Sequence, residues 1–298
     1  MAGRRVGLIN AGAIGDESAC QLHRTAMPEL PEVETIVREL RTRLTRRRVE
    51  SATVERADVV HGDPRPLGAL IAGRLVKTVD RRAKRIIIEL TRNLRLVFHL
   101  GMSGRLTIDD HDNPIAKHTH VRIGFGREIG ELRFRDPRRF GGVWVLTDAG
   151  EYVGKRLGRL GPEPLELAAK GFRRILASRR QIKALLLDQS KIAGLGNIYT
   201  DEALYAAGVH PMTPADALAE PIAGQLLRAI KQTLRRAIRA RGSTLMDYRT
   251  VDGQTGSFQR QHRVYGRTGQ PCRKCGARIE RIIVAGRSTC FCPRCQPL

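Results

Sequence analysis

The sequence contains no long apolar run. Its apolar stretches, such as 86–88 and 185–187, are short and lie beside charged residues, whereas a helix that crosses a bilayer needs about 20 apolar residues. We therefore expect no membrane-spanning helix. Hydrophobic residues nevertheless make up 41% of the 298 residues. That share can form a core for two domains, or for two domains and a small module, and it argues against extensive disorder.

Acidic residues are scarce relative to basic ones. The chain has 30 Asp and Glu against 53 Lys and Arg, a formal net charge of +23. Such an excess favours a polyanionic partner, because basic side chains release counterions from phosphates on binding. The charge is spread along the whole chain, which indicates a folded nucleic-acid-binding face and not a basic arm. A solvated basic surface, a ribosomal protein or a membrane-surface protein would have the same balance, and charge alone does not separate DNA from RNA.

Cysteine is almost absent before the C-terminal segment. Of the six cysteines, all but Cys20 lie from Cys272 onwards. A secreted disulfide-rich protein would spread them through the fold and carry a signal peptide. The segment 1–26 is a poor signal peptide, because Asp16, Glu17 and Arg24 interrupt its apolar part. We therefore expect a reducing, cytoplasmic compartment.

The C-terminal cysteines have the spacing of a zinc site. Two pairs, Cys272-x2-Cys275 and Cys292-x2-Cys295, are separated by 16 residues. Two such knuckles can place four thiolates tetrahedrally around zinc, with a β-hairpin between them. Four protein ligands close the site, so we expect one structural zinc ion and no zinc catalysis. Two disulfides are the alternative, which a reducing compartment disfavours. Cys290 has the wrong spacing for a ligand and is expected to pack inside the module.

The remaining pattern predicts an α+β protein. Residues 1–26 lack periodicity and indicate a disordered extension or a misassigned start. A helix is expected over 31–44, with acidic residues in its first turn and basic ones in its last. Short β-branched segments then predict an antiparallel β-sandwich, with strands at 75–79, 85–90, 94–100, 120–125, 132–134 and 143–147.

The pattern changes from strands to helices after the last of these segments. Gly161-Pro162-Glu163-Pro164 is the expected linker, and helices are predicted beyond it at 182–187, 202–207 and 221–241, the last with Gly242 as its C-terminal cap. We divide the chain into a catalytic sandwich domain (27–157), a helical DNA-binding domain (158–258) and a zinc finger (259–298).

Several motifs in one order resemble the bacterial formamidopyrimidine-DNA glycosylase family. The resemblance spans 27 to about 296, and only the ordered set is specific. The motifs are Met27-Pro28-Glu29-Leu30-Pro31-Glu32-Val33-Glu34-Thr35, Arg81-Arg82-Ala83-Lys84, His99-Leu100-Gly101-Met102-Ser103-Gly104, Asp136-Pro137-Arg138-Arg139-Phe140-Gly141, Leu160-Gly161-Pro162-Glu163-Pro164, Gly194-Leu195-Gly196-Asn197-Ile198-Tyr199, Val264-Tyr265-Gly266-Arg267 and the four-cysteine finger.

The resemblance implies a bifunctional DNA glycosylase/AP lyase that removes oxidised purines such as 8-oxoguanine and formamidopyrimidines. Pro28, as a free amino terminus, would attack C1′ of the damaged nucleotide. An α-amino group has a pKa near ~8, so a useful fraction is neutral at pH 7, and the iminium that it forms is an electron sink for β,δ-elimination and strand nicking. Without the other motifs, Pro28 would be interpreted as merely stiffening a helix entrance.

Three further residues match catalytic positions of the family. Glu29 would protonate the opening sugar ring, which requires a carboxyl group with a raised pKa, and Glu32 would support it. Lys84 would assist elimination beside a phosphate, and Arg287 would act in the second elimination. Taken alone, Glu32 could be a first-turn charge on the helix dipole, and Lys84 could be solvated surface.

Other positions match DNA contacts of the family. Met102, Arg138 and Phe140 correspond to the wedge that fills the gap left by a flipped nucleotide; a Met or Phe in a β-rich region is otherwise most often core. Gly194-x-Gly196-Asn197 corresponds to the turn of a helix-two-turns-helix motif, in which glycines let backbone amides approach a phosphate. The expected phosphate and DNA contacts are Asn197, Lys183, Tyr248, His99, His118 and Arg179. The loop that covers the flipped base is expected at 252–261.

Pro28 departs from the family pattern in one respect. In the printed chain it is an internal tertiary amide and has no free amine. Our hypothesis is that translation starts at Met27, or that 1–26 is removed, and that loss of Met27 then exposes Pro28.

Two other functions remain open at this point. The sister family, endonuclease VIII, has the same architecture and acts on oxidised pyrimidines, although Leu30-Pro31-Glu32 is closer to the purine branch. A zinc-ribbon DNA-binding protein without enzymatic activity, such as a damage sensor, is the third hypothesis. For the enzyme we expect damaged double-stranded DNA as partner, no membrane association, a monomer and a cytoplasmic location.

Overall fold

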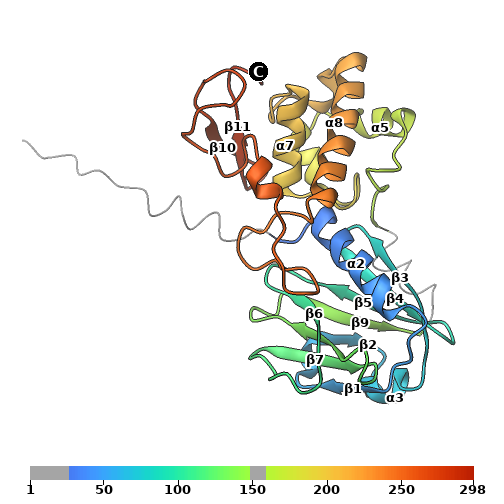
Figure 1. Ribbon diagram of the computed structural model, residues 1–298. Coiled ribbons are helices and arrows are strands. Elements are labelled where there is room, and N and C mark those ends of the chain that lie inside the picture. Colours follow the sequence, from blue (N-terminus) through green and yellow to red (C-terminus); the bar gives the residue numbers. More distant parts are fainter. Residues whose placement is uncertain (1–26, 148–158) are drawn as a thin grey trace, which may run out of the picture.

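The computed structural model describes residues 27–147 and 159–298 (Figure 1). The extension expected at 1–26 and the domain border expected at 157–158 lie outside these ranges. A β-rich part and a helical part meet at the first helix, α2 (Leu30–Leu44), which lies between them in Figure 1. Within the described residues, no helix is long and apolar enough to cross a membrane.

Helix α2 begins with a reciprocal cap. The Glu29 side chain accepts from the backbone of Glu32, and the Glu32 side chain accepts from the backbone N–H of Glu29, so two otherwise unpaired donors are satisfied. Pro31 stands in the first turn, where its missing N–H costs nothing. The helix buries one face against the sheets and also touches the last long helix, so its amino end is fixed at the junction of the two parts.

Two sheets form the β-rich part. The five-stranded sheet has the order β2-β9-β5-β4-β3 and the four-stranded sheet β1-β7-β8-β6. Phe98 and Phe134 face each other across the core, with ring centroids 6.1 Å apart. The strands are β1 (Ser51–Val54), β2 (Val60–Gly62), β3 (Val76–Arg82), β4 (Arg85–Leu90), β5 (Leu94–His99), β6 (Arg105–Asp109), β7 (Thr119–Gly124), β8 (Glu131–Arg135) and β9 (Gly142–Leu146).

The sandwich is confirmed, with differences of detail. All six predicted strands are present, but β1, β2, β6 and the short helix α3 (Leu67–Ile71) were not predicted. The residues of β1 and β2 are largely exposed or half-buried, so they give little hydrophobic alternation. The pairing of β2 with β9 is parallel, which corrects a purely antiparallel expectation. A 3-10 turn, η2 (Ala57–Val59), precedes β2.

The helical part has a core of its own. Its elements are α5 (Ala169–Leu176), α6 (Ile182–Leu187), α7 (Asn197–Ala207), η4 (Ala215–Ala217), α8 (Glu220–Arg239) and η5 (Phe258–Gln261). Helix α7 starts five residues before the predicted position. Its first turns hold Thr200 and Asp201, which are polar but almost fully buried, so the sequence there lacks an apolar stripe. After α8, Gly242 adopts φ +78° and donates its N–H to the Ala237 carbonyl, as a C-terminal cap requires.

The predicted hairpin is present at the C-terminus. Strands β10 (Glu280–Val284) and β11 (Arg287–Phe291) pair antiparallel. Ala285 and Gly286 both have positive φ, the geometry of a tight two-residue hairpin turn. Arg287 therefore follows a turn of defined shape, and β11 packs against α7.

Candidate active site

Glu29 lies where the two parts of the molecule meet. Its carboxylate is 3% exposed and accepts the Ile198 N–H at 2.9 Å, at the amino end of α7. Gly196 permits this approach, since a Cβ there would lie 2.3 Å from the Glu29 carboxyl carbon. The glycine turn thus presents its amides to a protein carboxylate. This corrects the expectation that these amides face a phosphate.

Burial sets the acidity of this group. Desolvation raises the pKa of Glu29 above its ordinary value, against the opposing charge of Lys84 and the backbone hydrogen bonds of α7. A carboxyl group with a raised pKa can hold a proton near neutral pH and deliver it to a substrate. The physical condition for a proton donor is therefore met.

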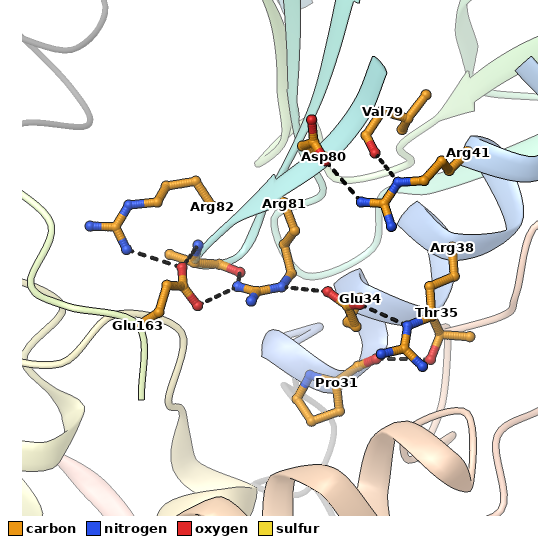
Figure 2. A network of polar contacts seen from close by, with 11 residues as sticks. Pro31, Glu34, Thr35, Arg38, Arg41, Val79, Asp80, Arg81, Arg82 and Glu163 are labelled. Carbon is orange, nitrogen blue, oxygen red and sulfur yellow. Dashed lines mark hydrogen bonds and ion pairs between the residues drawn. The ribbon is translucent and has the colours of Figure 1, made fainter. Parts of the chain in front are cut away.

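Lys84 lies on the two-residue turn between β3 and β4, and an ion-pair network holds that turn. Figure 2 shows Glu163 between Arg81 and Arg82, with Arg81 also directed at Glu34 on α2. The ion-pair distances are 2.8 Å from Glu163 to Arg81, 3.0 Å from Glu163 to Arg82 and 2.9 Å from Arg81 to Glu34. Glu163 accepts the Ala83 N–H as well, at 2.7 Å. The segment predicted as a linker therefore clamps the residue beside Lys84. Burial lowers the pKa of Lys84, while the Glu29 and Glu32 carboxylates oppose that shift.

One cavity of about 390 Å³ joins these groups, within the range of about 300–1,000 Å³ found for small-molecule sites. Glu29, Lys84 and Arg287 all line it, together with Met27 and Tyr265. Residues from the N-terminal segment, the β3–β4 turn and the zinc hairpin thus converge.

Pro28 is buried beside this cavity. It lines a smaller adjoining hollow with Met27 and Glu32. The four predicted catalytic residues therefore lie together at one place.

The three predicted wedge residues also lie together, on two neighbouring loops. The Arg138 guanidinium is 4.7 Å from the centroid of the Phe140 ring, and its Nη1 is 3.9 Å from the Met102 sulfur. Phe140 is 55% exposed, which costs hydration free energy for an isolated aromatic ring and is typical of a contact surface. Their role as a wedge stays a prediction.

A buried aspartate joins the two wedge loops. Asp136 is fully buried and accepts from the Ser103 hydroxyl at 2.5 Å and from the Gly141 N–H at 2.7 Å. The Arg138 N–H donates to the Ser103 oxygen at 3.2 Å. The backbone on either side of the wedge is therefore fixed by one carboxylate.

Two predicted phosphate contacts are wrong for this structure. Lys183 is 0% exposed, and its ammonium donates to Asp201 at 2.6 Å and to the Ser288 carbonyl at 3.2 Å. Tyr248 is 8% exposed and donates its hydroxyl to the Arg241 carbonyl at 3.1 Å. Both side chains are occupied inside the protein, and spacing along the sequence gave no sign of this.

The other predicted DNA contacts remain predictions. Asn197 donates its amide to the Ser288 carbonyl at 2.8 Å and lines the cavity. His99 is half-buried, and burial lowers its pKa to about 4. His118 and Arg179 are exposed. His118 and Arg179 lie on separate surface segments, and both are distant in sequence from the catalytic residues.

The expected lesion loop at 252–261 is not one loop. Its last four residues form η5, and the Phe258 side chain is 2% exposed in the helical core. This segment packs against the helices because burial of the apolar Phe258 side chain is favourable.

The four predicted cysteine ligands converge. All four sulfur atoms lie within 4.8 Å of one another, with Cys275 and Cys292 at 3.4 Å and Cys272 and Cys295 at 3.9 Å. A tetrahedral Zn–S distance of ~2.3 Å implies sulfur–sulfur separations of about 3.8 Å. The donor set therefore fits one structural zinc ion. Cys290 is buried in the finger as expected, but it also lines the catalytic cavity.

The sequence interpretation missed several groups around the cavity. Tyr265 belongs to the Val264-Tyr265-Gly266-Arg267 motif, but the sequence alone indicates no role for it. Glu202 fixes it by accepting three successive backbone N–H groups, of Arg263, Val264 and Tyr265, at 2.9–3.0 Å. The sequence offers only an acidic residue, Glu202, in a predicted helix. Its role follows only when the backbone groups that it binds are known.

Comparison with known proteins finds three family models that match along the chain. Family models match at 27–143 (Formamidopyrimidine-DNA glycosylase N-terminal domain), 160–249 (Formamidopyrimidine-DNA glycosylase H2TH domain) and 269–298 (Zinc finger found in FPG and IleRS). The formamidopyrimidine-DNA glycosylase of Laribacter hongkongensis is 44% identical over 275 residues, covering 91% of this chain and 100% of the relative. That of Thermus thermophilus is 44% identical over 279 residues, covering 91% and 98%.

The chain belongs to the formamidopyrimidine-DNA glycosylase family. It is a base-excision-repair DNA glycosylase. The crystal structure of the Thermus thermophilus family member has a TM-score of 0.80 at 42% identity and covers 90% of this chain and 98% of its own. A complex of the Lactococcus lactis glycosylase with an abasic-site DNA has a TM-score of 0.84 at 36% identity, covering 91% and 100%. The pyrimidine-acting and non-enzymatic alternatives are thereby displaced.

The buried Lys183–Asp201 pair gives a stability prediction. We expect Asp201→Asn to lower the free energy of unfolding by about 3–5 kcal/mol, because it leaves the Lys183 charge buried without its partner. The matched control is Glu89→Gln, which breaks the exposed Lys77–Glu89 pair at 3.1 Å and should cost at most about 1 kcal/mol. Urea unfolding measures both; equal losses would contradict the structural role assigned to Lys183.

Proposed function

We propose that this glycosylase excises oxidised purines from double-stranded DNA and then nicks the strand, with the Pro28 amine as nucleophile. The observation that carries the proposal is the buried Glu29 beside Pro28, in the cavity that Lys84 and Arg287 also line. A proton donor, an amine and two phosphate-binding cations are the groups that this chemistry requires.

The bond changes follow from these groups. The neutral Pro28 nitrogen adds to C1′ and the base leaves with the bonding electron pair, taking up the proton that the nitrogen loses. Glu29 then gives its proton to the ring oxygen as the sugar opens, which leaves an iminium at C1′ and a Glu29 carboxylate. The resulting iminium acidifies the C2′ hydrogen, so that transfer of this proton to the Glu29 carboxylate expels the 3′ phosphate. A second elimination expels the 5′ phosphate, and Lys84 and Arg287 stabilise the anionic groups that leave. Zinc supplies only structure.

The nucleotide has to leave the helix to reach Glu29. Flipping costs a few kcal/mol of stacking and pairing, which Met102, Arg138 and Phe140 would offset by filling the gap and contacting the orphaned base. Relatives of this chain were crystallised with DNA that contains Fapy-dG or an abasic site. We infer damaged duplex DNA as the partner here too, with the protein acting as a monomer in the cytoplasm.

Exposure of Pro28 is the first requirement of this mechanism. The family model begins at Met27, and Met27 itself lines the cavity. We expect a chain that starts at Met27 and loses it to be trapped covalently by borohydride on an 8-oxoguanine:cytosine duplex. The full chain should give no adduct, because an amide nitrogen does not add to C1′.

Intact mass provides the control, since it shows which amino terminus each preparation carries. Trapping of a full chain whose mass retains 1–26 would contradict the proline mechanism. If neither form is trapped although both bind abasic DNA, the proposed lyase step through Pro28 is wrong.

Glu29 gives a prediction that separates the two half-reactions. Glu29→Gln should slow base excision about 10²–10⁴-fold, because the amide cannot donate a proton, while trapping on preformed abasic DNA persists. In the unaltered protein, excision should fall as pH rises through the raised pKa of Glu29, since only the protonated carboxyl is active. The exposed Glu166→Gln is the control. Excision that survives in Glu29→Gln would remove Glu29 from the proton-donor role.

A further inference from the structure

A chain of buried polar side chains leads away from the active site. Glu32 accepts the hydroxyl hydrogen of Tyr199 on one carboxylate oxygen. The Tyr199 hydroxyl is 3.3 Å from the Ser243 oxygen, and Ser243 is 3.1 Å from His262 Nε2. All four side chains are at most 4% exposed. Four polar groups buried in contact must satisfy one another, because an unpaired buried donor or acceptor costs about 1–3 kcal/mol.

His262 ends this chain as a neutral acceptor. Its ring lies edge-on to Phe258 and Tyr265, each at 5.6 Å between centroids. Burial lowers the pKa of His262 to about 4, and one ring nitrogen hydrogen-bonds to the backbone of Tyr265. Since Nε2 faces Ser243, the proton belongs on the other nitrogen, where it can be donated to the Tyr265 carbonyl. Nε2 is then free to accept the Ser243 hydroxyl hydrogen.

The chain can satisfy two protonation states of Glu32. When Glu32 is ionised, Tyr199 donates to Glu32 and Ser243 donates to His262. When Glu32 is protonated, the direction reverses at its near end: Glu32 donates to Tyr199, Tyr199 donates to Ser243, and Ser243 still donates to His262. Only the arrangement with protonated Glu32 requires all three hydrogen bonds, and it requires an acceptor for the Ser243 hydroxyl hydrogen.

We propose that His262 is a positioning residue for base excision, which keeps the protonated form of Glu32 satisfied through Ser243 and Tyr199. The proposal deepens the glycosylase function proposed above and rests on it for its effect on the reaction. Burial and the neighbouring Glu29 carboxylate raise the pKa of Glu32 to about 7, so both arrangements are populated near neutral pH.

Glu32 is coupled directly to the proton donor. The Glu29 N–H donates to the second Glu32 oxygen at 2.9 Å, and each carboxylate disfavours ionisation of the other. The other groups that face Glu32 are Lys84 across the cavity, the Ser243 N–H at 2.7 Å and the Tyr248 hydroxyl, which is 3.5 Å from the Glu32 carbonyl. If Glu32 ionises more readily, its negative charge disfavours ionisation of Glu29, and Glu29 therefore keeps its proton to a higher pH.

The matched variants are His262→Leu and His262→Gln in a chain that starts at Pro28. Leucine fills the space without an acceptor, whereas glutamine offers an amide oxygen. Carbon-13 NMR of the Glu carboxyl carbons, assigned with Glu32→Gln, follows the titration of Glu32. We expect His262→Leu to lower its midpoint by about one pH unit, since losing a hydrogen bond to one protonation state shifts the equilibrium about tenfold. His262→Gln should restore most of the shift.

Activity gives the second measurement. The alkaline limb of 8-oxoguanine excision should move to higher pH in His262→Leu, opposite to the shift of Glu32, and return in His262→Gln. An unchanged Glu32 midpoint in His262→Leu, or an equal shift in both variants, would overturn the proposal. If His262→Leu does not melt cooperatively, Ser243→Ala removes the middle link and should lower the midpoint in the same direction. Failure of the parent chain that starts at Pro28 to excise or to be trapped would sink the proposed function while leaving the NMR test intact.

Discussion

The placement of one carboxylate constrains the whole molecule. Glu29 lies on the amino-terminal amides of α7, and the next residue, Leu30, donates its N–H to the Gly194 carbonyl at 3.1 Å. The start of the β-rich part is thereby attached to the turn that begins α7. The favourable field of a helix amino terminus partly offsets the cost of burying the carboxylate, and the remaining cost leaves Glu29 with a raised pKa. Burial of Glu29 on α7 therefore both joins the two parts of the molecule and raises the pKa of this carboxyl group.

The zinc hairpin, formed by β10 and β11, is fixed to the same helix. Asp201 on α7 accepts from Lys183 and also from the Cys290 N–H at 2.9 Å, while Lys183 reaches the Ser288 carbonyl. These contacts hold the strand that begins with Arg287. Glu163 clamps the turn that carries Lys84, which also lines the cavity. The cavity is therefore built by three rigid attachments, each a charged group buried against backbone donors or acceptors, as precise positioning requires.

The sequence predicts the parts of this site better than their connections. Hydrophobic periodicity identifies α2 and α8, and cysteine spacing identifies the metal ligands, because both signals are local. Ordered motifs bring Glu29, Lys84 and Arg287 to attention before any coordinates are known. Lys183 and Tyr248 show the limit: a basic or phenolic side chain looks the same in a sequence whether it faces a phosphate or, as here, a buried aspartate or a carbonyl. His262 gives no sequence signal, since its partners come from segments far apart in the chain.

The most direct test of the account is to locate the covalent bond to DNA. The chain beginning at Pro28 would be trapped with borohydride on an abasic duplex, digested, and analysed by mass spectrometry for the peptide that carries the sugar remnant. The account predicts attachment at the Pro28 nitrogen, beside the buried Glu29. Attachment at Lys84, an amine that lines the cavity beside Pro28, would contradict it.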